Sequence, residues 1–237
     1  MFSFFRRSRP KISPRDAAWR RLAVRLELSD EAARAPRLCE LLDLPLDTEV
    51  GPVYGLELDL AKSSLFFDYR ERRSGPTGQV DALVSGCTLS CHEPIAGMSL
   101  RASQKLHPVL ESLGASSIGG VVVELDDADC NDDFNDRVSL FARDVAAARR
   151  LLTPATRKAL LGVLYTRGLE PTLLLGERDL VATNRTSTAE PTDLVALEAL
   201  AVNLLTLYTT LSRPDTSPET VDEPVDDPSA DPSKELE

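Results

Sequence analysis

The stretch Arg137-Val-Ser-Leu-Phe-Ala-Arg-Asp144 decides the fold, because it is a strand pattern that feeds directly into a helix pattern. Within residues 137–144, apolar and polar positions alternate in the two-residue period of a half-buried strand, with Phe141 as the exception. The apolar face of this predicted strand consists of Val138, Leu140 and Ala142. We therefore expect a strand here with one buried face.

Two helices are predicted directly after this strand. The run of alanines, arginines and leucines over residues 145–152 favours a short helix. Thr153 is a favourable N-cap, and Pro154 suits the first helical position, where no N–H group is needed. Gly168 offers an end to the second helix.

An acidic segment, residues 126–136, precedes the strand and imitates a calcium-binding loop. Such a loop needs a glycine at its sixth position and a glutamate at its twelfth, but the chain has Asp132 and Val138 there. A solvated acidic loop is therefore the favoured interpretation, with weak affinity for divalent ions as the alternative. The oxygen ligands that imitate the loop are Asp127, Asp129, Asn131 and Asp133.

The region from Asp132 to Pro154 resembles the C-terminal half of a bacterial domain family of unknown function that carries a Leu-Leu-Thr-Pro signature. Members of that family often have membrane-spanning helices near the N-terminus, which this sequence does not show. The resemblance implies a fold but no reaction and no site residues. The matching residues are Asp132, Phe134, Arg137, Val138, Asp144, Ala146, Ala147, Leu151, Leu152, Thr153 and Pro154.

The part of the chain before this unit predicts helices followed by strands. Ser13 and Pro14 begin a helix whose apolar stripe includes Trp19, the single tryptophan. We expect a second helix over residues 30–44, interrupted near Pro36, and a third over residues 103–113. Alternating residues predict three antiparallel strands and a later buried strand, at residues 53–60, 64–73, 79–90 and 121–125.

The part after the central unit predicts a hairpin and the longest helix, over residues 171–184 and 191–212. Together these patterns predict an α+β fold, a mainly antiparallel sheet of about six strands with packed helices. The alternative is two small α+β halves that divide near residues 96–119.

Charge divides the 237 residues into three segments, although the net charge is −11. The first 25 residues hold eight basic residues against one acidic residue, and residues 214–237 hold nine acidic residues against one lysine. We expect a basic, aromatic N-terminal segment at residues 1–12, one domain at residues 13–213 and a disordered acidic tail at residues 214–237. The acidic body disfavours a general nucleic-acid-binding protein.

The N-terminal segment combines aromatic rings with cations. Rings at the headgroup level and cations against anionic lipid would give weak peripheral attachment to a membrane. A frayed, solvated terminus is the competing interpretation. The membrane-contact candidates are Phe2, Phe4, Phe5, Arg6, Arg7, Arg9 and Lys11.

Cysteine usage favours a cytoplasmic protein, with possible attachment at the inner membrane surface through the N-terminal segment. No secretory signal precedes the four cysteines, so we expect reduced thiols. Cys87, Cys91 and His92 are the candidate metal ligands, with Cys130 or His107 as a fourth. Because no second closely spaced ligand pair exists, buried thiols are favoured over a zinc site.

The sequence offers little support for catalysis, since it contains no phosphate loop, nucleophile elbow or dinucleotide fingerprint. We expect a non-catalytic interaction or adaptor module that has no cofactor and binds a protein partner. The alternative is a metal-binding protein or metal-dependent enzyme that uses the cysteine–histidine cluster or the acidic loop. Contact with nucleic acid through the basic N-terminus is the third hypothesis.

Overall fold

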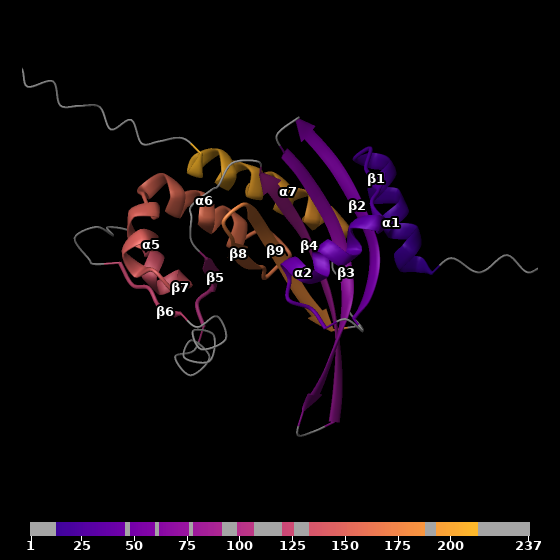
Figure 1. Cartoon of the computed structure of the whole chain (residues 1–237), viewed down its shortest axis with the longest axis horizontal. Helices are drawn as coiled ribbons and strands as arrows, with labels where there is room; N and C mark the ends of the chain where they lie inside the picture. Colours follow the sequence, from indigo (N-terminus) through magenta and orange to yellow (C-terminus); the bar gives the residue numbers. More distant parts are fainter. Residues whose placement is uncertain are drawn as a thin grey trace, which may run out of the picture.

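The computed structural model describes residues 13–45, 48–59, 62–75, 78–91, 99–106, 120–125, 133–187 and 193–212, and the following account concerns these residues. Their strands form one nine-stranded sheet in the order β1-β2-β3-β4-β9-β8-β5-β7-β6, in which every neighbouring pair is antiparallel (Figure 1). The predicted α+β class and antiparallel pairing are confirmed. The predicted number of about six strands is too small.

The three successive strands, which were predicted from alternating residues, and the later predicted hairpin are both present. The three strands are β2 (Glu49–Asp59), β3 (Lys62–Gly75) and β4 (Gly78–Cys91). The hairpin consists of β8 (Thr172–Leu175) and β9 (Asp179–Ser187), and β9 pairs with β4. The far end of the β3–β4 hairpin projects from the body as a two-stranded ribbon (Figure 1).

Two strands were not predicted: β1 (Ser29–Asp30) and β5 (Leu100–Gln104). β1 has two residues, which is too short for a periodic signal. The buried strand predicted at residues 121–125 is present only as β6 (Val121–Val122), and Val121 is 53% exposed. The helix predicted over residues 103–113 is wrong at its start, because β5 pairs with β7 on one side and β8 on the other. Residues 107–113 lie outside the described part of the chain.

The strand predicted at residues 137–144 is β7 (Val138–Ala142), and it lies between β5 and β6. All five of its residues are buried, so both faces of the sheet are covered at this point. Phe141, the exception to the predicted alternation, is only 1% exposed. Phe141 is apolar because the face of β7 that was predicted to be exposed to solvent is also buried.

Two helices follow β7 as predicted, and each begins at a side-chain cap. Asp144 accepts a hydrogen bond from the Ala147 N–H at the start of α5 (Val145–Leu151). Thr153 accepts one from the Thr156 N–H at the start of α6 (Pro154–Leu164). A single turn, α4 (Phe134–Arg137), precedes the strand.

The first and last helices are also close to their predicted bounds. Ser13 caps α1 (Pro14–Arg25), and Asp193 caps α7 (Leu194–Leu211). The helix predicted over residues 30–44 is instead a short 3-10 turn, η1 (Ala32–Arg34), followed by α2 (Ala35–Leu41). The beginning of that region joins the sheet edge, since β1 pairs with β2.

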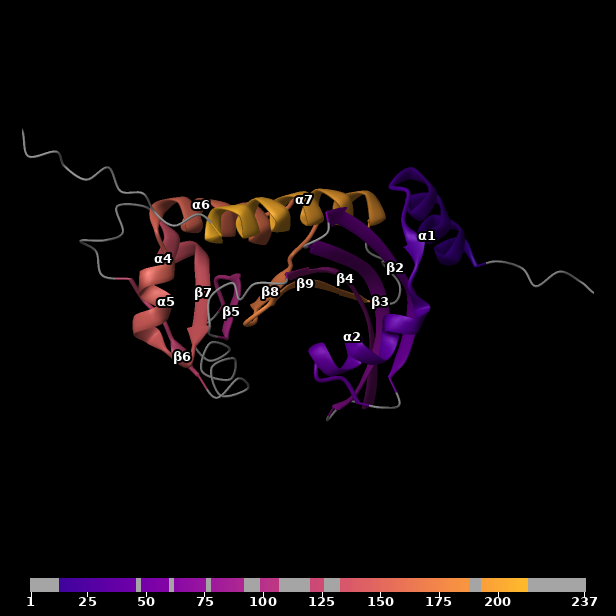
Figure 2. The same ribbon diagram turned by 45° about the horizontal axis from the view of Figure 1, so that its top comes forward.

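The two faces of the sheet carry two separate cores. Figure 2 shows α6 and α7 on one side of the sheet and α2 on the other. We call these the α7 face and the α2 face. The larger core lies under α1, α6 and α7 and includes Trp19, Phe66, Cys87, Leu180 and Leu197. The smaller core lies under α2 and consists of Leu38, Val53, Leu65, Phe67, Tyr69, Val84 and Val181.

Helix α7 is long and apolar enough to cross a membrane by length and composition, with a mean hydropathy of 1.7. A core helix passes the same test, so this finding is weak support for a membrane span. Leu197, Leu200, Leu204 and Leu207 are at most 1% exposed and pack into the larger core. The helix thus has a core-facing side in this fold.

Candidate functional site

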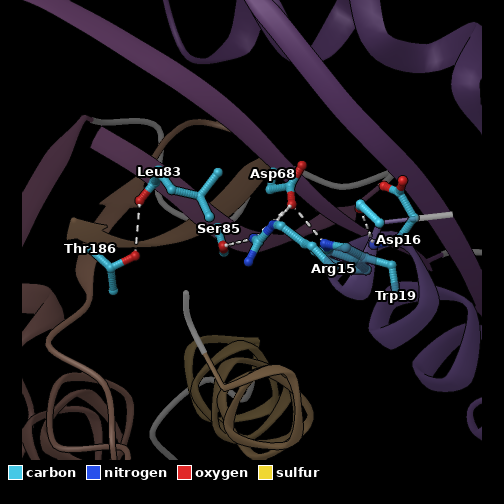
Figure 3. A network of polar contacts seen from close by, with 8 residues as sticks. Arg15, Asp16, Trp19, Asp68, Leu83, Ser85 and Thr186 are labelled. Carbon is cyan, nitrogen blue, oxygen red and sulfur yellow. Dashed lines mark hydrogen bonds and ion pairs between the residues drawn. The ribbon is translucent and has the colours of Figure 1, made fainter. Parts of the chain in front are cut away.

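Among the described residues, the most buried charged side chain is that of Asp68, which lies on the α7 face of β3. Its residue is 4% exposed, and it receives hydrogen bonds from α1 (Figure 3). Trp19 Nε1 donates to Asp68 Oδ2 at 2.6 Å, and Arg15 Nε donates to the same oxygen at 2.7 Å. Arg15 Nη2 also donates to Ser85 Oγ on β4 at 2.9 Å. We call Arg15, Trp19, Asp68 and Ser85 the α1 network.

Two opposing effects set the electrostatics of this network. Burial raises the pKa of the Asp68 carboxyl above its ordinary value, because the charged form loses hydration. The Arg15 guanidinium and the two donated hydrogen bonds lower that pKa, but burial has the larger effect. The network therefore fixes α1 across β3 and β4 through one carboxylate whose donors come from the helix.

A cleft of about 650 Å³ opens beside the α1 network, at the beginning of α1. Gly51 on β2 is required there, because a Cβ atom at this position would lie 1.7 Å from Asp68 Oδ1. Charged residues of both signs line the cleft: Arg15, Asp16, Glu49 and Arg70. Because both signs of charge are present, the lining favours neither an anionic nor a cationic ligand.

A second cleft, of about 340 Å³, lies on the α2 face, and we call it the α2 cleft. It extends from the end of α2 to strands β5, β8 and β9. Its apolar wall includes Leu41, Leu174 and Val181, which belong to or pack against the smaller core. The cleft is therefore an opening in the cover of that core.

Four charged residues surround the apolar wall of the α2 cleft: Asp43, Arg101, Arg143 and Asp179. Asp179 is held in place, because Ser90 Oγ donates a hydrogen bond to its Oδ1 at 2.5 Å. Asp43 lies two residues beyond Leu41, the last residue of α2, and its backbone is in the left-handed region, with φ 51°. Asp tolerates this conformation better than most residues. An apolar centre with a charged rim is the usual anatomy of a protein interface.

The candidate metal ligands Cys87 and Cys91 lie on one strand, β4, four residues apart. Their Cα atoms are therefore about 13 Å apart at the rise of an extended strand. Two sulfurs bound to one zinc ion are less than about 5 Å apart, so these two side chains cannot share an ion. Both residues belong to the larger core, and burial raises the pKa of the Cys87 thiol to about 12.

Several predicted candidates lie outside the described residues. They include the whole membrane-contact set at Phe2, Phe4, Phe5, Arg6, Arg7, Arg9 and Lys11, as well as His92, His107, Cys130 and most of the acidic loop. Asp133, the last oxygen ligand of the predicted calcium loop, is exposed and lies 3.7 Å from Arg137. Within the described ranges, no group of three or more His, Cys, Asp and Glu side chains is arranged to hold a metal ion.

Sequence reasoning did not identify the α1 network or the α2 cleft. A signal for the network was present, because Asp68 is a lone acid within the apolar run Leu65-Phe-Phe-Asp-Tyr69. Its partner Arg15 is 53 residues away in the sequence, so the pairing itself has no local signature. The α2 cleft depends on β5, a strand that was not predicted, because the helix predicted over residues 103–113 begins beyond the cleft-lining residues Ser99, Leu100 and Arg101.

None of three comparisons, with protein-family models, with curated proteins and with solved structures, finds a match to this chain. The resemblance of residues 132–154 to the bacterial family with the Leu-Leu-Thr-Pro signature therefore stays a prediction.

Proposed function

We propose that this protein is a non-catalytic interaction module that binds a protein partner through the α2 cleft. The observation that supports the proposal is that the described residues cover the smaller core incompletely. Helix α2 has seven residues, whereas α7 on the opposite face has 18. The apolar wall beside α2 is therefore open to a partner.

The dimensions of the α2 cleft suit a side-chain anchor. A volume of about 340 Å³ accommodates one or two large apolar side chains. Protein interfaces are commonly stabilised by a few such anchors in central pockets, surrounded by a polar rim. Arg101, Arg143, Asp43 and Asp179 supply both signs of charge around the wall, which favours a peptide or protein surface over a singly charged small molecule.

The experiment compares Leu41→Asp with a matched control, Val195→Asp. Leu41 lines the α2 cleft, whereas Val195 is 57% exposed on the first turn of α7. Proteins captured from the native cell by the wild-type chain and by Val195→Asp, but not by Leu41→Asp, are then purified, and their direct binding is measured by calorimetry. A partner that binds all three chains equally would contradict the proposal.

We also propose that residues 1–12 attach the module weakly to an anionic membrane surface in the cytoplasm. Each cation near such a surface contributes about 1 kcal/mol, which permits reversible but not permanent attachment. Flotation with anionic vesicles at low and high salt compares the full chain with a chain lacking residues 1–11. Salt-sensitive flotation of the full chain alone is expected, and equal behaviour of both chains would contradict the attachment.

A further inference from the structure

A strongly basic region of this acidic protein lies between residues 137 and 168, in addition to the one that includes α1. Between Arg137 and Gly168, the chain has seven basic residues and a single acidic residue, Asp144. These residues belong to the α4–β7–α5–α6 unit, at the end of the molecule away from α1 (Figure 2). The overall net charge of −11 therefore conceals a local excess of positive charge.

We define the basic surface by three cations of this unit: Arg149 and Arg150 at the end of α5, and Lys158 on α6. All three are exposed. Arg149 Nη2 donates to the Glu124 carbonyl oxygen at 2.9 Å, which holds its guanidinium against the body of the protein. By contrast, Arg157 is 6% exposed and donates to the Leu152 carbonyl oxygen, so it stabilises the α5–α6 connection.

Helix α7 ends at this end of the molecule, at Leu211. Asn203 Nδ2 donates to the Gly162 carbonyl oxygen and to Thr166 Oγ1, so the middle of α7 lies against the C-terminal end of α6. From Asn203 to Leu211 the helix advances about 12 Å. Figures 1 and 2 both show this last part of α7 running back over α6, toward α5.

We propose that the acidic tail, residues 214–237, docks on the basic surface of the same chain. The tail carries nine acidic residues and one lysine, opposite in sign to the surface beside which α7 ends. Because the tail is tethered to α7, its local concentration at the basic surface is in the millimolar range, so weak charge pairing suffices to hold it there. The basic surface is thus an interaction site whose occupant is encoded in the same chain.

The basic N-terminal segment is the competing site for the tail. Helix α7 has 18 residues and is therefore about 27 Å long, with Glu198 near its beginning paired to Arg25 of α1. That length is several times the Debye length of about 8 Å at physiological ionic strength. The first acids of the tail consequently experience the field of α5 and α6 before that of α1.

The experiment uses the full chain labelled with ¹⁵N and compares wild type with a neutral-tail variant. In this variant the body is unchanged, and the tail acids are replaced by Asn or Gln: Asp215, Glu219, Asp222, Glu223, Asp226, Asp227, Asp231, Glu235 and Glu237. Amide chemical shifts are recorded at about 0.01 M and about 1 M salt, where the Debye length is about 30 Å and 3 Å. We expect the α5 and α6 amides to differ between the two chains at low salt and to coincide at high salt.

A matched pair of charge reversals locates the docking site. Arg150→Glu with Lys158→Glu should abolish the tail-dependent shifts, whereas Arg20→Glu with Arg21→Glu, both exposed on α1, should preserve them. Tail-dependent shifts that appear on α1, that spread evenly over the surface or that are absent at low salt would overturn the proposal. If the charge-reversed chain fails to fold, the comparison of wild type with the neutral-tail variant still tests the proposal by itself.

Discussion

The two faces of the sheet are built differently, although the same strands contribute alternate residues to both. On β3, Phe66 and Asp68 point to the α7 face, whereas Leu65, Phe67 and Tyr69 point to the α2 face. The α7 face is closed by α1, α6 and α7, and the α1 network lies within its cover. Among the described residues, the α2 face carries the seven-residue helix α2 and an open apolar cleft beside it.

This difference between the two faces indicates which of them can bind a partner. Apolar area removed from water contributes about 25 cal/mol per Å², so a face with an incomplete cover gives less stability to the chain alone. The same incomplete cover leaves apolar surface that an incoming side chain can bury. We therefore expect the α7 face to dominate stability and the α2 face to dominate binding.

The largest effect should come from Leu200→Ala on the α7 face. Leu200 is 0% exposed among the side chains of the larger core, so truncation should lower the free energy of unfolding by about 4 kcal/mol. Leu38→Ala under α2 should cost about 2 kcal/mol, because a short helix beside an open cleft can relax into the space. Urea denaturation measures the free energy of unfolding of both variants. Equal decreases in the two variants would contradict the expected difference between the faces.

The second effect concerns the α1 network. Asp68→Ala should lower the free energy of unfolding by about 3 kcal/mol, since it leaves the Trp19 and Arg15 donors without their shared acceptor. Asp68→Asn should cost much less, because the amide oxygen can still accept both hydrogen bonds. Thermal denaturation of the two variants at neutral pH checks this order, and a more damaging Asn variant would refute it.

A smaller and opposite effect is expected at Gly162, on the exposed side of α6. The nearest atom to a Cβ added there would be Asn203 Oδ1 at 4.0 Å, so the position has space for a methyl group. Gly162→Ala should raise the free energy of unfolding by about 0.5–1 kcal/mol through better helix propensity. Gly86→Ala is the contrasting variant, because its Cβ would lie 2.4 Å from the Ala182 carbonyl oxygen, and it should destabilise.

The smallest expected effect is a pH dependence of the free energy of unfolding, which arises from Asp68 on the α7 face. Because burial raises the pKa of Asp68 in the folded chain above its ordinary value of 3.8, the folded state binds this proton more tightly than the unfolded state. The stability that this tighter proton binding contributes is fully present below pH 3.8, and it is lost as the pH rises through the raised pKa of Asp68 in the folded chain. Relative to Asp68→Asn, wild type should therefore lose stability over that interval and then remain level, as measured by urea denaturation from acid to neutral pH. The opposite slope would mean that the ion pair with Arg15 outweighs burial.

Much of the local structure was predictable because its causes are local. The caps at Ser13, Asp144 and Thr153 are short-range hydrogen bonds, of which Ser13 and Thr153 were recognised in advance. Alternation identified β2, β3, β4 and β7, because their residues follow the two-residue period of a strand, with Phe141 of β7 as the exception.

What escaped prediction depends on contacts between distant residues. Strand β5 is defined by its pairing with β7 and β8 on its two sides, and only its last two residues, Ser103 and Gln104, fall within the predicted helix. Arg15 and Asp68 come together only when α1 lies across the sheet. The α2 cleft arises from four elements that meet at one end of α2, and no single segment carries its signature.

The burial of Cys87 makes this thiol a reporter on the opening of the sheet. Its side chain is 0% exposed in the larger core, and its pKa of about 12 leaves almost no thiolate at neutral pH. Alkylating reagents react with thiolates, so Cys87 becomes reactive only in molecules whose sheet has transiently separated from α7. Cys39, which is half-buried on α2, reacts without that separation and supplies the internal reference. The ratio of the two labelling rates therefore measures how often the protein opens under native conditions, without denaturant and without any added probe residue.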